Sequence, residues 1–91
     1  MTAAVQVTVK LRVTVLDGWQ VCPLVERANE KIAAVKRQAL AAAGIDAARA
    51  GDYVVKFGGA LIADESRSLS ELRVPDGAAL VVLAAHRRAV R

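Results

Sequence analysis

Side chains that could carry out chemistry are few in this chain and lie far apart. The only histidine, His86, falls among the last six of the 91 residues, and the acidic residues are scattered over predicted turns and one helix start. A catalytic site needs a nucleophile with its base, converging carboxylates or a set of metal ligands. We therefore predict no catalytic residues, no cofactor and no metal site, and we expect His86 to face solvent.

Two further features that often accompany chemistry have simpler interpretations here. Cys22 is the only cysteine, so it has no partner for an internal disulfide and no second thiol for a metal or redox motif. We expect a buried, unreactive thiol. The pair Gly58-Gly59 lacks the surrounding residues of a phosphate-binding loop, and it predicts a turn instead.

Length and charge limit the remaining possibilities. We predict one domain at residues 1–85 and a basic tail at 86–91, which carries much of the net charge of +4. Because the basic residues lack interleaved aromatics and a recognition helix, we do not expect nucleic-acid binding. No apolar run approaches the roughly 20 residues of a membrane span. We expect no signal peptide, because the N-terminus lacks a basic patch followed by an apolar stretch and a cleavage site. We expect a cytoplasmic protein that contacts membranes only indirectly, if at all.

The first 25 residues predict a β-hairpin. Apolar and polar residues alternate from Val5 to Leu16, the pattern of a strand with one buried face. Asp17-Gly18 favours a type I′ turn into a second strand at 19–25. The predicted pairs are Leu16 with Trp19, Val15 with Gln20, Val13 with Cys22, and Leu11 with Leu24. This register buries Cys22 and Leu24, whereas a three-residue loop would reverse the two faces. Pro23 predicts an edge strand.

An amphipathic helix is predicted at 32–45. Ile32, Val35, Ala39, Leu40 and Ala43 recur at helical spacing and should share the buried face. Lys36, Arg37 and Gln38 are expected to lie away from it. Asn29 is the predicted N-cap, and Gly44 the residue that ends the helix.

The second half of the chain supplies the rest of a sheet. Strands are predicted at 53–57, 60–63 and 80–84, and a short helical turn at 66–72 should bury Leu69 and Leu72. Together with the hairpin and helix they indicate an α+β domain, in which a mixed sheet of four or five strands has one helix packed on one face. A right-handed crossover makes the first and last strands parallel neighbours at the centre.

From the helix to the last strand, the chain resembles the ubiquitin-like β-grasp family. The matching residues are Ile32, Val35, Lys36, Gly44, Ile45, Phe57, Gly59, Ile62, Asp64, Leu69, Ser70, Glu71, Val74, Leu80 and Val82. Their spacing within each block is similar to that of ubiquitin, with one extra residue between Asp64 and Leu69. The composition looks more like the bacterial YukD/EsaB-type proteins and the EccD ubiquitin-like domains of type VII secretion.

Departures from the family pattern bear on function. Ubiquitin and its sulfur-carrier relatives act through a C-terminal Gly-Gly, whereas no glycine follows Gly77 here. The resemblance therefore implies a module that is not conjugated, and the alternative is a modifier or sulfur carrier of an unusual conjugation system. Lys56, Val81 and Leu83 replace residues of ubiquitin's recognition patch, so its usual partners should not bind.

The predicted register leaves an apolar surface with basic neighbours on the outside of the sheet. Its members are Arg12, Leu16, Trp19, Val21, Val54, Lys56, Val81 and Leu83. Exposed apolar area of this kind usually marks a partner site, so we predict that another protein binds here. Two alternatives remain open: a longer loop could turn Trp19 into the core, or the tail could fold over the sheet. A homodimer through an edge strand, using 5–9, is a further possibility.

Overall fold

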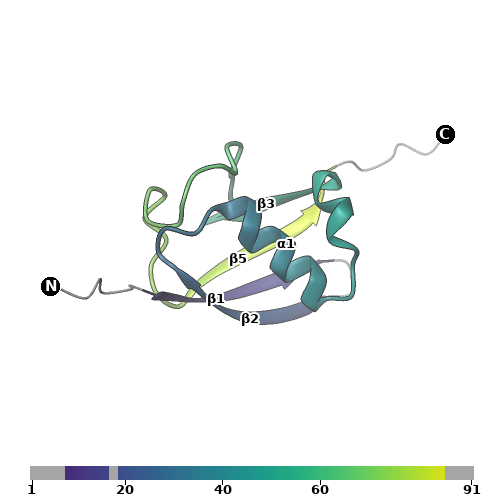
Figure 1. The fold of residues 1–91 in the computed structure, drawn as a ribbon, viewed down its shortest axis with the longest axis horizontal. Helices are drawn as coiled ribbons and strands as arrows, with labels where there is room; N and C mark the ends of the chain where they lie inside the picture. The colour runs from purple at the N-terminus through teal and green to yellow at the C-terminus, as the bar shows by residue number, and fades with distance from the viewer. Residues whose placement is uncertain (1–7, 17–18, 86–91) are drawn as a thin grey trace, which may run out of the picture.

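The computed structural model describes residues 8–16 and 19–85 as a mixed five-stranded sheet with one helix on one face (Figure 1). The strand order is β2-β1-β5-β3-β4. The elements are β1 (Thr8–Val15), β2 (Gln20–Arg27), α1 (Ile32–Ala42), the 3-10 helix η1 (Ala47–Asp52), β3 (Tyr53–Phe57), β4 (Ala60–Leu61) and β5 (Ala78–Ala84). The predicted fold class is confirmed. No helix among the described residues is long and apolar enough to cross a membrane.

The β1–β2 register is the predicted one. Val13 pairs with Cys22, Leu11 with Leu24, and Val15 with Gln20, where the pairing ends. Trp19 stands outside the ladder with a φ of 55°, and its N–H donates to the Leu16 carbonyl at 3.1 Å. The predicted strand residues 5–7 and the turn residues 17–18 lie outside the described residues, and the turn type stays a prediction. Four residues separate the last paired residues, where the prediction had two. Because both numbers are even, every residue of the second strand stays on its predicted face of the sheet.

The central strand is β5, which is parallel to β1 and antiparallel to β3. This confirms that the first and last strands are parallel neighbours. The strand begins at Ala78, earlier than predicted, because the preceding turn is bonded to β1: Gly77 donates its N–H to the Lys10 carbonyl at 2.7 Å. The Lys10 N–H donates to the Asp76 carboxylate at 2.8 Å.

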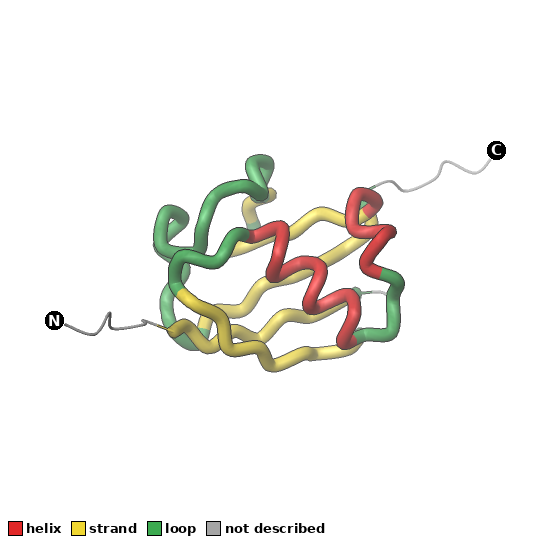
Figure 2. The backbone as a smooth tube through the Cα atoms, viewed as in Figure 1, coloured by secondary structure: helices red, strands yellow, loops and turns green. Residues whose placement is uncertain are grey.

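The prediction of Asn29 as the N-cap of α1 is wrong. The residue at that position is Lys31, which makes no side-chain capping bond. The N–H groups of Ile32 and Ala33 have no acceptor within the helix. They donate instead to the carbonyls of Arg67 and Glu65, at 3.0 and 2.9 Å. A loop distant in sequence therefore satisfies the donors that a capping side chain would have taken, and Figure 2 shows loop segments gathered beside the start of the helix.

The helix also ends earlier than predicted, at Ala42. Gly44 has a φ of 82°, and the Ile45 N–H donates to the Leu40 carbonyl at 2.8 Å. Gly44 thus takes the left-handed position that closes a helix, as the sequence indicated.

Lys36 was predicted to lie away from the buried face, and this is wrong. It is only 5% exposed, and its Nζ donates to the Tyr53 carbonyl at 2.8 Å and pairs with Glu65 Oε1 at 2.6 Å. The long aliphatic stem can cross apolar surface while the ammonium group reaches polar partners beyond it. Arg37 is exposed as expected.

The core lies between α1 and the inner face of the sheet. Ile32, Val35, Ala39 and Leu40 of the helix pack in one cluster with alternate residues of the strands, Cys22 included. The predicted helical turn at 66–72 is instead a series of turns, in which Leu69 is fully buried and Leu72 half-buried. The predicted strand at 60–63 is reduced to the two residues of β4.

Candidate functional site

The outer face of the sheet is the surface opposite α1. Strand pairing sets Val21 beside Thr14, Thr14 beside Val81, and Val81 beside Lys56. The intervening strand residues belong to the core, so these side chains point away from the helix. The outer face is formed by Lys10, Arg12, Thr14, Val21, Pro23, Val25, Val54, Lys56, Leu61, Ala79, Val81 and Leu83.

Six of the eight predicted site residues are brought together on this face by the register: Arg12, Val21, Val54, Lys56, Val81 and Leu83. Leu16 continues β1 for one residue, since its N–H donates to the Val82 carbonyl at 2.9 Å, and it is half-buried. Trp19 is 76% exposed and is not part of the core. Its left-handed backbone interrupts the alternation, so the strand pattern does not assign it to either face.

Exposure is greatest at the margins of the outer face. Val54, Val81 and Leu83 at the centre are half-buried, whereas Val21 and Val25 on the β2 edge are 59% and 64% exposed. Leu61, which pairs beside Lys56 from β4, is 54% exposed. Val25 and Leu61 were missed in the sequence. The alternation of the second strand already placed Val25 on the same face as Val21, and only the observed β3–β4 pairing identifies Leu61.

The charged side chains at the outward strand positions are of one sign, and the Asp76 carboxylate lies beside the Lys10 backbone in the turn before β5. Lys10, Arg12 and Lys56 point outward, and the only acidic residue in the described strands is Glu26, which faces inward beside Val9. The strands therefore present apolar side chains among cations, with no carboxylate at the outward positions of the described strands. Such a surface favours a ligand that is apolar and anionic.

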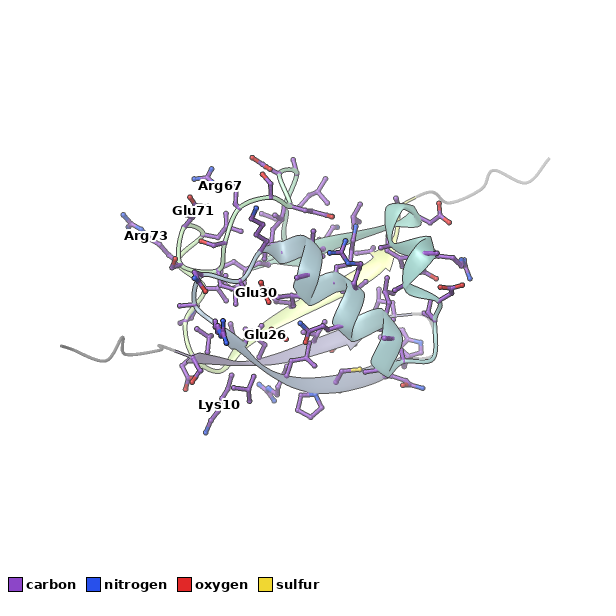
Figure 3. All side chains as sticks on the ribbon, viewed as in Figure 1. Lys10, Glu26, Glu30, Arg67, Glu71 and Arg73 are labelled. Atoms are coloured by element: carbon purple, nitrogen blue, oxygen red, sulfur yellow. The ribbon has the colours of Figure 1, made fainter. Side chains whose placement is uncertain are left out.

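Glu26 is itself unusual. It is 5% exposed, its Oε1 accepts a hydrogen bond from Gln38 Nε2 at 3.2 Å, and its Oε2 has no partner. Burial raises the pKa of Glu26, with a smaller contribution from the Glu30 carboxylate, while the bond from Gln38 opposes this. Glu26 and Glu30 are labelled in Figure 3. The alternation that buries Cys22 and Leu24 also points Glu26 inward, but the predicted strand ended at Val25 and so did not include it.

The described residues contain no group of three or more His, Cys, Asp or Glu side chains that could hold a metal ion. Cys22 is buried, with its Sγ 3.9 Å from the Ala39 carbonyl. A shallow groove of about 360 Å³ lies at the β4 edge, lined by Phe57, Leu61, Ile62 and Leu72 with Asp64 and Arg67. The surfaces available for binding are the outer face of the sheet and the groove at the β4 edge.

No protein-family model and no curated protein matches the chain. Solved structures do match it along nearly its whole length. A de novo designed protein based on ubiquitin aligns with a TM-score of 0.74 at 10% identity, covering 92% of this chain and 96% of its own.

Two natural proteins show the same likeness. Ubiquitin from Caldiarchaeum subterraneum aligns with a TM-score of 0.67 at 18% identity, covering 90% of this chain and 99% of its own. The ubiquitin-like domain of an Arabidopsis thaliana protein gives 0.74 at 18% identity, covering 99% and 90%. At these identities the likeness concerns the fold, and the fold is a ubiquitin-like β-grasp.

Proposed function

We propose that the chain is a non-catalytic interaction module that binds another protein through the outer face of its sheet. The observation that carries this is the row Val21, Thr14, Val81, Lys56 and Leu61, which crosses all five strands on the side without a helix. A sheet face that keeps apolar side chains accessible beside cations is typical of a partner site.

The chemistry of the face indicates what such a partner presents. Val54, Val81 and Leu83 supply a half-buried apolar centre, and Arg12 and Lys56 lie on either side of Val81's strand. We infer that the partner contributes apolar side chains to the centre and carboxylates to the two cations. Charge complementarity of this kind raises association rates and specificity more than affinity.

A narrower assignment comes from the sequence resemblance. We propose a bacterial, cytoplasmic module that is not conjugated, and an association with type VII secretion of the YukD/EsaB or EccD kind. This assignment rests on the composition and on the sequence resemblance.

Site-specific photo-crosslinking in cells of the source organism tests the proposed site. A photoreactive residue replaces Val54 on the outer face, and in a control it replaces Ala41, an exposed residue of α1. We expect a discrete protein adduct at Val54 that is lost when Lys56→Glu is added. Adducts from Ala41 alone, or a Val54 adduct that survives Lys56→Glu unchanged, would place the partner elsewhere.

A further inference from the structure

Exposed apolar side chains are concentrated on one hairpin. Among the described residues, the large apolar side chains with high exposure are Trp19 (76%), Val25 (64%), Val21 (59%) and Leu61 (54%). Three of these belong to β2 and the turn that leads into it. Single exposed valines are ordinary, but a group of this kind beside a tryptophan indicates a surface that is covered in use.

Cations border these side chains. Lys10 pairs beside Val25, and Arg12 beside Pro23. Arg27 is exposed at the end of β2. Lys10 points away from the body of the molecule (Figure 3). We call Lys10, Arg12, Trp19, Val21, Val25 and Arg27 the hairpin surface.

Two occupants of the hairpin surface are disfavoured by its composition. A second copy would bring two sets of the same cations together, and Pro23 deprives the β2 edge of a backbone donor for strand pairing. A nucleic acid would meet the cations, but the surface has one aromatic side chain on which a base could stack, and the valines would gain nothing.

The composition of the hairpin surface favours a lipid bilayer as its occupant. The groove lined by residues from Phe57 to Leu72 is separate from the hairpin surface. The hairpin instead presents projecting side chains, and tryptophan with neighbouring lysine and arginine is the combination found where proteins enter the interface of an anionic bilayer.

We propose that the β1–β2 hairpin docks on the surface of an anionic phospholipid bilayer. Trp19, Val21 and Val25 enter the boundary between headgroups and acyl chains, and Lys10, Arg12 and Arg27 lie at the lipid phosphates. The hairpin surface shares Arg12 and Val21 with the proposed protein site, but the bilayer contact does not require a protein partner.

Trp19 is the only tryptophan, so its fluorescence reports directly on docking. The full chain is titrated with phosphatidylcholine vesicles that contain phosphatidylglycerol, and with pure phosphatidylcholine vesicles as the uncharged control. We expect a blue shift of the emission, and quenching by lipids brominated on the acyl chains, with the anionic vesicles only. Both effects should weaken as salt is raised.

Variants at hairpin-surface residues that are not among the eight predicted protein-site residues locate the contact. Lys10→Glu should lower vesicle partitioning by about fivefold or more, since each basic residue near the membrane contributes a factor of this order. Val25→Ser should lower it several-fold through lost apolar contact. Arg37→Glu, an equal charge change at an exposed position of α1, should have a much smaller effect.

Three results would overturn the proposal. The first is an unchanged Trp19 emission with anionic vesicles at low salt. The second is an equal loss of binding in Lys10→Glu and Arg37→Glu, which would reflect overall charge. The third is a protein adduct from a photoreactive residue at position 25 without any vesicle response, which would make the hairpin surface a protein interface.

Discussion

At the scale of single residues, Glu26 is the group whose placement opposes folding. A carboxylate that is buried with one oxygen unpartnered costs free energy in its charged form. The fold nevertheless holds it beside Gln38 on the inner face of β2. Stability should therefore depend on whether Glu26 carries a proton.

The raised pKa of Glu26 predicts that the free energy of unfolding falls as the pH rises. Because the folded pKa of Glu26 is raised above 4.5, the folded state holds the proton more tightly than the unfolded chain. This contribution to the free energy of unfolding is fully present below the unfolded pKa. It is lost as the pH rises through the higher folded value. Denaturant unfolding of wild type and Glu26→Gln across this range should show the fall in wild type only.

Asp52→Asn is the matched control for Glu26→Gln. Asp52→Asn removes an exposed carboxylate whose ion pair with Arg49 is long, at 3.9 Å. It should retain the wild-type fall in stability. If Glu26→Gln retained the fall as well, Glu26 would be solvated in the folded protein and the inward placement would be wrong.

Lys36 is the opposite case, a buried charge with both partners in place. Lys36→Met keeps the stem and removes the bonds to Glu65 and to the Tyr53 carbonyl. We expect unfolding to require about 1–2 kcal/mol less, because Glu65 retains some access to water. Chemical denaturation measures this, and Arg37→Met at the neighbouring exposed position should stay within about 0.5 kcal/mol of wild type.

At the scale of elements, the two ends of α1 are determined by different means. The start depends on carbonyls of the 65–67 loop, whereas the end depends on Gly44 in the left-handed region at a φ of 82°. The first is a tertiary contact and the second is local. This explains why the sequence identified the glycine and assigned the wrong N-cap.

Gly44→Ala tests the local end. A Cβ built there meets no atom within 4 Å, so any loss comes from the backbone conformation alone. We expect the melting temperature to fall, with about 1 kcal/mol lost. Gly51→Ala is the control, since it has equal space and no positive φ, and it should be neutral. Equal behaviour of the two variants would contradict the assigned closing role of Gly44.

At the scale of the whole molecule, the sheet is most protected at its centre. β5 bonds to β1 on one side and β3 on the other, and Leu80 and Val82 are fully buried. Amide hydrogen exchange followed by NMR should therefore be slowest in β5 and faster in β2 and β4 at the edges. Protection of β2 that matched β5 and increased with protein concentration would instead support the predicted edge-strand homodimer.

Much of the fold and part of the candidate site followed from periodicity. Alternation in β1 and β5, and the even loop before β2, placed Val21, Val81 and Leu83 on the face opposite the helix. Side-chain direction along a strand is a local property, so it can be predicted without knowing what packs against the strand. Leu61 could not be assigned in this way, because β4 is only two residues long.

The sequence by itself therefore determined the type of each main element, its two faces and the even number of residues in the hairpin loop. The tertiary structure alone decided the N-cap of α1 and the burial of Lys36. These outcomes depend on contacts between segments far apart in the chain. Whether a charged group is buried depends on the partners that other segments bring to it, and no local pattern records them.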